Sequence, residues 1–166
     1  MKPSKFFLIL GIFFLSLFSW ELYLRNRSSR LAFASAPSQS SSINMDTPVI
    51  IKINSVGIEL PVIPASFDGK NWPTTTKGAS FIPESNVFYA HNWSNLFGPL
   101  AKVKPGDSIE IITKDGKTYT YTVAFTQEIE PNQTYILNQT IDSRLTLYTC
   151  IGFLDSKRFV VTAFID

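Results

Sequence analysis

The sequence predicts an all-β domain, a barrel or sandwich of seven or eight short strands, behind an apolar N-terminal segment. Short apolar runs with β-branched and aromatic residues recur from residue 49 to the C-terminus. Turn-forming residues separate these runs, and only residues 95–103 have a briefly helical pattern. The length of 166 residues sets a prior of one domain and excludes a (β/α)₈ barrel, which needs about 250 residues.

Residues 6–24 are an apolar segment whose only polar members are two serines and Glu21. A helix of that length spans roughly 28 Å, close to the thickness of a bilayer's hydrocarbon core. A cleaved signal peptide is the alternative, because Lys2 and Lys5 form a basic start and residues 32–36 contain small-residue cleavage patterns. Three arginines lie before that point, so we expect residues 1–30 to be an uncleaved transmembrane anchor.

The net charge of +2 conceals an asymmetry between the two parts of the chain. Residues 1–30 carry five basic side chains and one acidic one, whereas residues 31–166 carry ten basic and twelve acidic ones. The body is therefore mildly acidic, which gives no electrostatic reason to expect a nucleic-acid partner. Residues 31–48 are rich in Ser, Ala and Pro without apolar periodicity, which predicts a flexible linker to a body at 49–166.

The body divides into strands in order. A turn at 54–57 joins the first two strands, and the sequence Lys-Asp-Gly-Lys at 114–117 predicts a hairpin. We interpret residues 64–85 as a loop. The expected strands are residues 49–53, 58–63, 87–91, 108–113, 118–125, 145–150 and 159–165.

Few side chains of the chain are candidates for nucleophilic catalysis, because it has one cysteine, Cys150, and one histidine, His91. A single cysteine excludes an intramolecular disulfide. A single cysteine and a single histidine also argue against a structural zinc site, since such sites use four ligands. By base rate a lone cysteine is most often a small buried hydrophobe. Both residues end predicted strands, however, and Arg158 opens the last strand, so all three suit one cleft at a barrel rim.

These residues carry a resemblance to the sortases, cysteine transpeptidases that attach proteins to bacterial cell surfaces. Residues 146–150, TLYTC, match the TLxTC motif of that family. The strand from Arg158 to Ala163 resembles the one that carries the family's arginine, and residues 87–92 resemble the segment with its histidine. Ala90 stands where the family often has glycine. The resemblance covers residues 49–166 and is closest to the compact housekeeping type.

The resemblance implies a closed barrel of seven to eight strands with short helical connections, and a mechanism. Cys150 would attack an LPxTG-like sorting signal, His91 would act as acid and then base, and Arg158 would stabilise the oxyanion. A free thiol with a pKa near about 8.5 is only partly ionised at neutral pH, so the cysteine needs activation. We expect no cofactor and no metal. The residues expected to bind substrate are Thr149, Tyr148, Trp93 and Asn92.

The implied partners are surface proteins with a C-terminal sorting signal and an amine acceptor, either a peptidoglycan cross-bridge or a pilin lysine. The implied location is the bacterial cell membrane, crossed once, with the catalytic domain outside the cytoplasm. Two other functions stay open from the sequence. One is a cysteine peptidase that uses water as acceptor, and the other is a membrane-tethered β-domain without catalysis. An L,D-transpeptidase is a weaker third, because its usual SHGC-like context is absent.

Overall fold

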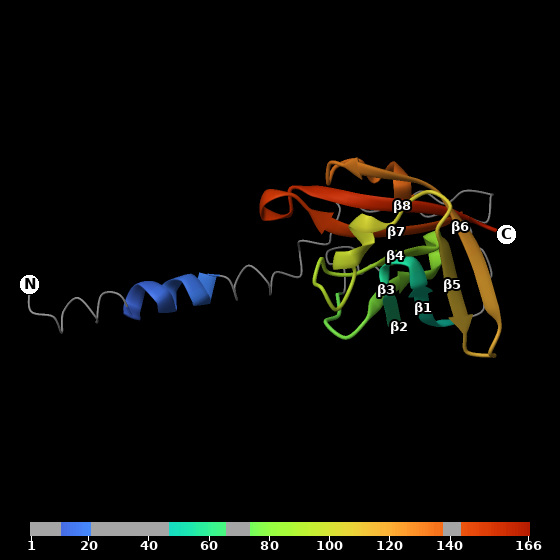
Figure 1. Ribbon diagram of the computed structural model, residues 1–166, viewed down its shortest axis with the longest axis horizontal. Helices are drawn as coiled ribbons and strands as arrows, with labels where there is room; N and C mark the ends of the chain where they lie inside the picture. Colours follow the sequence, from blue (N-terminus) through green and yellow to red (C-terminus); the bar gives the residue numbers. More distant parts are fainter. Residues whose placement is uncertain (1–10, 21–46, 66–73, 138–143) are drawn as a thin grey trace, which may run out of the picture.

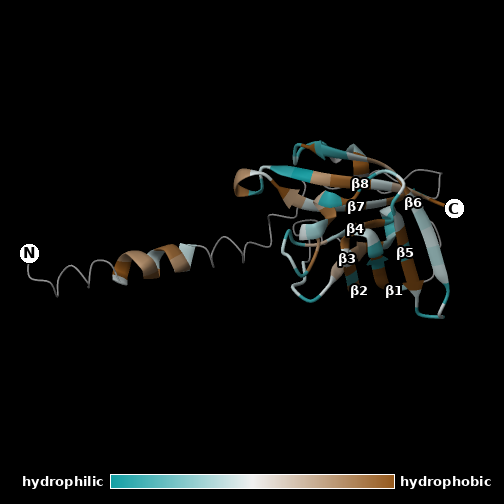
Figure 2. Ribbon diagram, viewed as in Figure 1, coloured by the Kyte–Doolittle hydropathy of each residue, from teal (hydrophilic) through white to brown (hydrophobic). Residues whose placement is uncertain are grey.

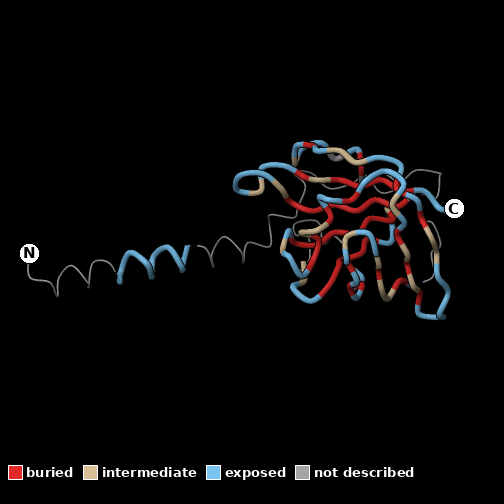
Figure 3. The backbone as a smooth tube through the Cα atoms, in the orientation of Figure 1, coloured by how far each residue is buried: buried red, intermediate tan, exposed pale blue. Residues whose placement is uncertain are grey.

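The structure is a computed structural model that describes residues 11–20, 47–65, 74–137 and 144–166. Residues 11–20 form a helix whose large apolar side chains are exposed (Figures 2 and 3). Within the described ranges, no helix has both the length and the apolar character that crossing a membrane requires. The rest of the anchor expected at 1–30, and residues 31–46 of the expected linker, lie outside the described residues.

The body is built from strands joined by turns and 3₁₀ helices (Figure 1). The short helices are η2 (Asn54–Val56), η3 (Pro83–Ser85), η4 (Gly98–Lys102), η5 (Thr134–Leu137) and η6 (Phe153–Asp155). The described strands are β1 (Pro48–Ile53), β2 (Ile58–Pro64), β3 (Ala79–Ile82), β4 (Val87–Tyr89), β5 (Ser108–Thr113), β6 (Thr118–Ile129), β7 (Arg144–Ile151) and β8 (Lys157–Ile165).

The strands close into a barrel in the order β1-β2-β3-β4-β7-β8-β6-β5. Strands β2 and β3 pair in parallel, as do β4 and β7, and the remaining neighbours are antiparallel. Closure removes the exposed sheet edges through which open sheets associate. The expected closed all-β barrel with short helical connections is therefore confirmed.

The barrel interior is filled from one face of every strand, as the alternation of side chains along a strand requires. The stretch around η4 closes one end of the barrel with the side chains of Leu96, Phe97, Leu100 and Val103, all buried. Figure 3 shows the buried segments concentrated in the strands and the exposed ones in the turns. The interior residues include Phe88 of β4, Ala90 just after it, and Leu145 and Leu147 of β7.

A second group of buried residues, which we call the outer cluster, packs on the outward face of the same strands. Its members come from β3, β4, β6, η5, β7 and β8: Ile82, Val87, Tyr89, Ile129, Ile136, Tyr148, Cys150 and Val160. The outer cluster matters for function because the only cysteine of the chain belongs to it.

The structure corrects the predicted elements in three places. The segment 64–85 is not all loop, because β3 occupies Ala79–Ile82; only Phe81 and Ile82 of its four residues are large and apolar, too short a run to mark a strand. Strand β6 continues to Ile129 and β8 begins at Lys157, since their outer ends pair with each other. The helical pattern at 95–103 forms only the short η4.

Gly116 has the positive φ of 82° that the predicted hairpin needs.

Candidate active site

Cys150 and Arg158 face each other across the antiparallel pair β7–β8. The register aligns Cys150 with Arg158 and Tyr148 with Val160. Directly opposed residues in such a pair have Cβ atoms about 5 Å apart, with side chains on the same face. Both residues are 3% exposed, so the thiol and the guanidinium share a nearly water-free environment. A charged group in such a place is costly unless interactions compensate for its lost hydration.

His91 approaches from the side of β4, the other neighbour of β7; the strand expected at 87–91 ends at Tyr89, because its pairing with β7 ends there, so His91 lies in the turn that follows. The parallel register aligns Tyr89 with Tyr148. His91 and Cys150 follow these two tyrosines by two residues each. The strands stay together over this interval, because the Thr149 hydroxyl donates a hydrogen bond of 2.8 Å to the carbonyl of Ala90. The fold therefore places the three residues that the sequence singles out on neighbouring segments: Cys150 on β7, Arg158 opposite it on β8, and His91 just after β4.

The loop after β4 holds His91 from two sides. The backbone N–H of Phe97 donates to the His91 carbonyl at 3.1 Å, and the indole of Trp93 stacks on the imidazole, with ring centroids 4.6 Å apart and planes 11° apart. Trp93 is fixed in turn, since its carbonyl accepts hydrogen bonds from Leu96 N–H and Gly98 N–H, both at 2.9 Å. The ring of His91 thus has a restricted set of orientations.

Arg158 is held by the turn between β7 and β8. Its Nη1 atom donates to the carbonyls of Asp155 at 2.9 Å and Lys157 at 3.1 Å. Leu154 and Asp155 both have positive φ, 52° and 59°, a conformation that costs a non-glycine residue about 1–2 kcal/mol. The turn therefore holds a strained backbone that presents a carbonyl to the guanidinium.

Two buried tyrosines, Tyr89 and Tyr148, precede His91 and Cys150 by two residues. Burial raises the pKa of Tyr89 from 10 to about 12, and a hydrogen bond with Ser80 partly opposes this. Burial also raises the pKa of Tyr148 well above 10; nearby Tyr89 and Cys150 raise it further, whereas Arg158 lowers it. Both phenols are consequently neutral at physiological pH.

The residues expected to bind substrate differ in their access to solvent. Asn92 is exposed and Trp93 is half-buried. Thr149 and Tyr148 are both fully buried, and the Thr149 hydroxyl is engaged by Ala90. Sequence reasoning missed Tyr89, although its position two residues before His91 mirrors that of Tyr148 before Cys150.

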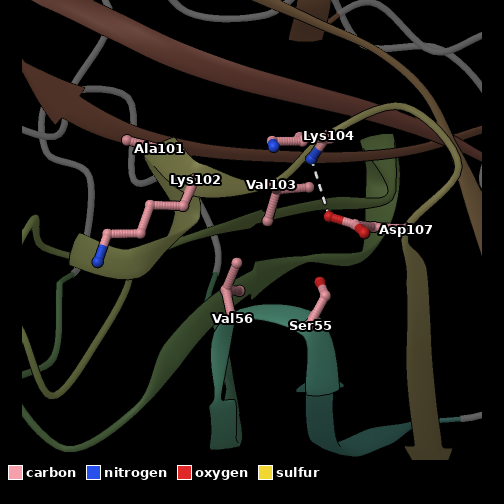
Figure 4. Close-up of a pocket in the computed structure, with 7 residues that line it drawn as sticks. All are labelled: Ser55, Val56, Ala101, Lys102, Val103, Lys104 and Asp107. Carbon is pink, nitrogen blue, oxygen red and sulfur yellow. Dashed lines mark hydrogen bonds between the residues drawn. The ribbon is translucent and has the colours of Figure 1, made fainter.

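A hollow lies apart from this site. It has a volume of about 760 Å³ and lies between η2 and the stretch from the end of η4 onward, and neither Cys150, His91 nor Arg158 lines it (Figure 4). Its lining residues are Ser55, Val56, Ala101, Lys102, Val103, Lys104 and Asp107. In the described ranges, no group of three or more His, Cys, Asp or Glu side chains is arranged to hold a metal ion. Strand register is what defines the candidate site.

Comparison with known proteins gives a consistent result. A family model described as "Sortase domain" matches residues 51–165. Sortase A of Listeria monocytogenes is 34% identical over 121 residues, covering 66% of this chain and 52% of that protein. Sortase A of Bacillus anthracis is 34% identical over 122 residues, covering 67% and 56%. The chain spans about half the length of these curated relatives. The structure of Listeria monocytogenes sortase A superposes with a TM-score of 0.60 at 29% identity, covering 73% of this chain and 88% of that one.

Proposed function

This chain belongs to the sortase family, and we propose that it is a cysteine transpeptidase that cleaves an LPxTG-like sorting signal and transfers the acyl part to an amine. The observation that carries the proposal is the strand register. It opposes Cys150 to Arg158 and continues from the Tyr89–Tyr148 pair to His91 and Cys150. A cysteine that only filled space in the core would not need two buried ionisable side chains on the segments beside it.

In the proposed first step, the Cys150 thiolate attacks the carbonyl carbon of the scissile peptide bond. The guanidinium of Arg158 donates hydrogen bonds to the oxyanion that forms, an interaction strengthened where water is excluded. As the C–N bond breaks, protonated His91 gives its proton to the leaving amine, and the acyl group remains on Cys150 as a thioester.

In the second step, an incoming amine attacks the thioester carbon. His91, now neutral, takes the proton from that amine, and the tetrahedral intermediate collapses with Cys150 as leaving thiolate. The enzyme returns to its starting protonation state. An amine acceptor makes the reaction a transpeptidation, whereas water would make it a hydrolysis. The acceptor we propose is a peptidoglycan cross-bridge or a pilin lysine.

The four other expected residues take two roles in this proposal. Asn92 and Trp93 have accessible surface and would contact the sorting signal beside His91. Thr149 and Tyr148 are fully buried, so they would pack beneath the site and maintain its shape, while the sorting signal first contacts the accessible residues. We propose that no cofactor takes part, because thiol, imidazole and guanidinium supply the nucleophile, the proton carrier and the oxyanion donor.

We also propose that residues 1–30 anchor the chain in the bacterial membrane by a single span, with residues 31–48 as linker and the barrel outside the cytoplasm. The exposed apolar surface of the helix at 11–20 supports this, since such a surface needs an apolar environment. The substrates would then be surface proteins delivered to the same membrane face.

The test is intact-mass spectrometry of the full chain in detergent, incubated with LPxTG-like peptides with and without a glycine-based amine. An acyl adduct on Cys150 that moves to the amine, and is absent from Cys150→Ala, would establish transpeptidation. Peptide cleavage that gives only the hydrolysed product, whether or not the amine is present, would instead identify a peptidase. No adduct, combined with a Cys150 that resists thiol reagents, would favour the non-catalytic tethered domain.

A further inference from the structure

The outward face of β4, β7 and β8 carries two rows of side chains across the sheet. One row contains Cys150 and Arg158, which the register opposes, and His91 follows two residues after the end of the face's next strand, β4. The other row contains Tyr89 and Tyr148, which the register aligns with each other. Side chains two residues apart on a strand lie on the same face, so Tyr148 lies beside Cys150 on β7, and Tyr89 is the last residue of β4 before the turn that carries His91.

The two tyrosine rings are stacked and completely enclosed. Their centroids are 5.3 Å apart with planes 11° apart, and both residues are 0% exposed. The rings bridge β4 and β7 where those strands pair in parallel over only three positions, with the pairing ending at Tyr89. His91 therefore lies just beyond the last paired residue, and backbone pairing alone does not hold it against Cys150.

We propose that the stacked rings of Tyr89 and Tyr148 are a positioning pair that sets the placement of His91 relative to Cys150. The proposal rests on the proposed function and adds two residues to it that act through others. It assigns the role to the rings rather than to the hydroxyls. Tyr148 and Cys150 belong to the same buried outer cluster and are two residues apart on β7, so the ring also packs near the thiol.

The protein offers a matched control on the same strand. Phe88 is next to Tyr89 but points into the barrel, where it forms a tilted pair with Phe81, with centroids 4.4 Å apart. Both residues of that pair are buried as well. Phe88→Leu therefore removes a buried cross-strand aromatic contact from β4 without touching the face that carries Cys150 and His91.

The experiment compares full-length Tyr148→Leu, Tyr89→Leu and the corresponding phenylalanine variants with Phe88→Leu. Thermal stability is measured first, then kcat and KM for peptide transfer. In the leucine variants of the tyrosines we expect kcat to fall about 10- to 100-fold with little change in KM, since small misplacements of reacting groups are that costly. The phenylalanine variants keep kcat within about twofold, and Phe88→Leu lowers stability while retaining kcat. If Tyr148→Leu does not fold, Tyr89→Leu removes the same stack from the other strand.

A second measurement needs no substrate and separates this proposal from the proposed function. The rate of Cys150 alkylation by iodoacetamide is recorded against pH for wild type, His91→Ala and the tyrosine variants, because a nearby imidazole changes the thiolate fraction. We expect the leucine variants to shift from the wild-type profile toward that of His91→Ala. A wild-type profile in both leucine variants would overturn the positioning role while leaving the dyad intact.

The remaining outcomes also decide the question. Identical profiles for wild type and His91→Ala would remove the dyad itself, and the positioning pair with it. A raised KM at unchanged kcat would overturn positioning and make Tyr148 a substrate contact. Loss of kcat in the phenylalanine variants equal to that in the leucine variants would assign the effect to the hydroxyls and refute the role of the rings.

Discussion

Replacing Thr149 by valine tests the bond that ties the two site-bearing strands together. Thr149 is completely buried, and its hydroxyl donates to the Ala90 carbonyl at 2.8 Å. Valine has nearly the same shape but no donor, so the carbonyl loses this bond in a place that water does not reach. Leaving a buried group unsatisfied costs about 1–3 kcal/mol, and the added methyl group returns about 0.8 kcal/mol through apolar burial.

The expected net loss in the free energy of unfolding is therefore about 0.2–2 kcal/mol, or roughly 1–8 °C in Tm for a domain of this size. Urea denaturation followed by circular dichroism measures it. We also expect kcat of the folded protein to fall, because the bond lies directly before His91 and Cys150 on the two strands. Thr149→Ser retains the donor and should retain kcat.

Thr113→Val is the matched control for this prediction. Thr113 is buried too, and its hydroxyl donates to the Asp115 carboxylate in the β5–β6 turn, with the carbonyl of Lys117 at 3.1 Å as a second acceptor. That turn adjoins the start of β6, whereas the candidate site adjoins its end at Ile129, roughly 30 Å away along the strand. Stability should fall in both valine variants and kcat only in Thr149→Val. Equal kcat losses, or a Thr149→Val protein as stable as wild type, would refute the reasoning.

Three further predictions concern the residues around the site. In Gly98→Ala the new Cβ would lie 2.6 Å from the Trp93 carbonyl oxygen, so the turn must shift; we expect lower Tm together with a lower kcat/KM, as Trp93 no longer stacks correctly on His91. The pKa of Tyr89, about 12 when folded and 10 when unfolded, means that stability is full below pH 10 and falls by about 2–3 kcal/mol as pH rises to 12, which urea titrations against Tyr89→Phe will measure. Arg158→Lys should lose about 10²- to 10³-fold in kcat while remaining folded, because an ammonium cannot reproduce the planar donor geometry of the guanidinium; a lysine variant with wild-type kcat would remove Arg158 from the mechanism.

Local sequence information predicted much of this protein correctly. Alternation of apolar residues and the turn at 114–117 identified seven of the described strands, because side-chain period and turn chemistry are properties of neighbouring residues. The scarcity of cysteine and histidine, together with the TLxTC pattern, selected Cys150 and His91. Their roles in catalysis stay predictions; the register opposes Cys150 to Arg158 and aligns Tyr89 with Tyr148, two residues before His91 and Cys150.

What the sequence alone did not determine concerns partners distant in the chain. Strand β3 was missed because it has four residues, of which only Phe81 and Ile82 are large and apolar, too short an apolar run to mark a strand. The parallel pairings β2–β3 and β4–β7, and with them the stack of Tyr89 on Tyr148, were also missed. A local pattern states which face of a strand is apolar, whereas the identity of the neighbouring strand depends on how all eight strands close around one core. Composition and local pattern therefore determined the residues available for chemistry, and barrel closure decided which of them meet, because only closure fixes the register between strands far apart in sequence.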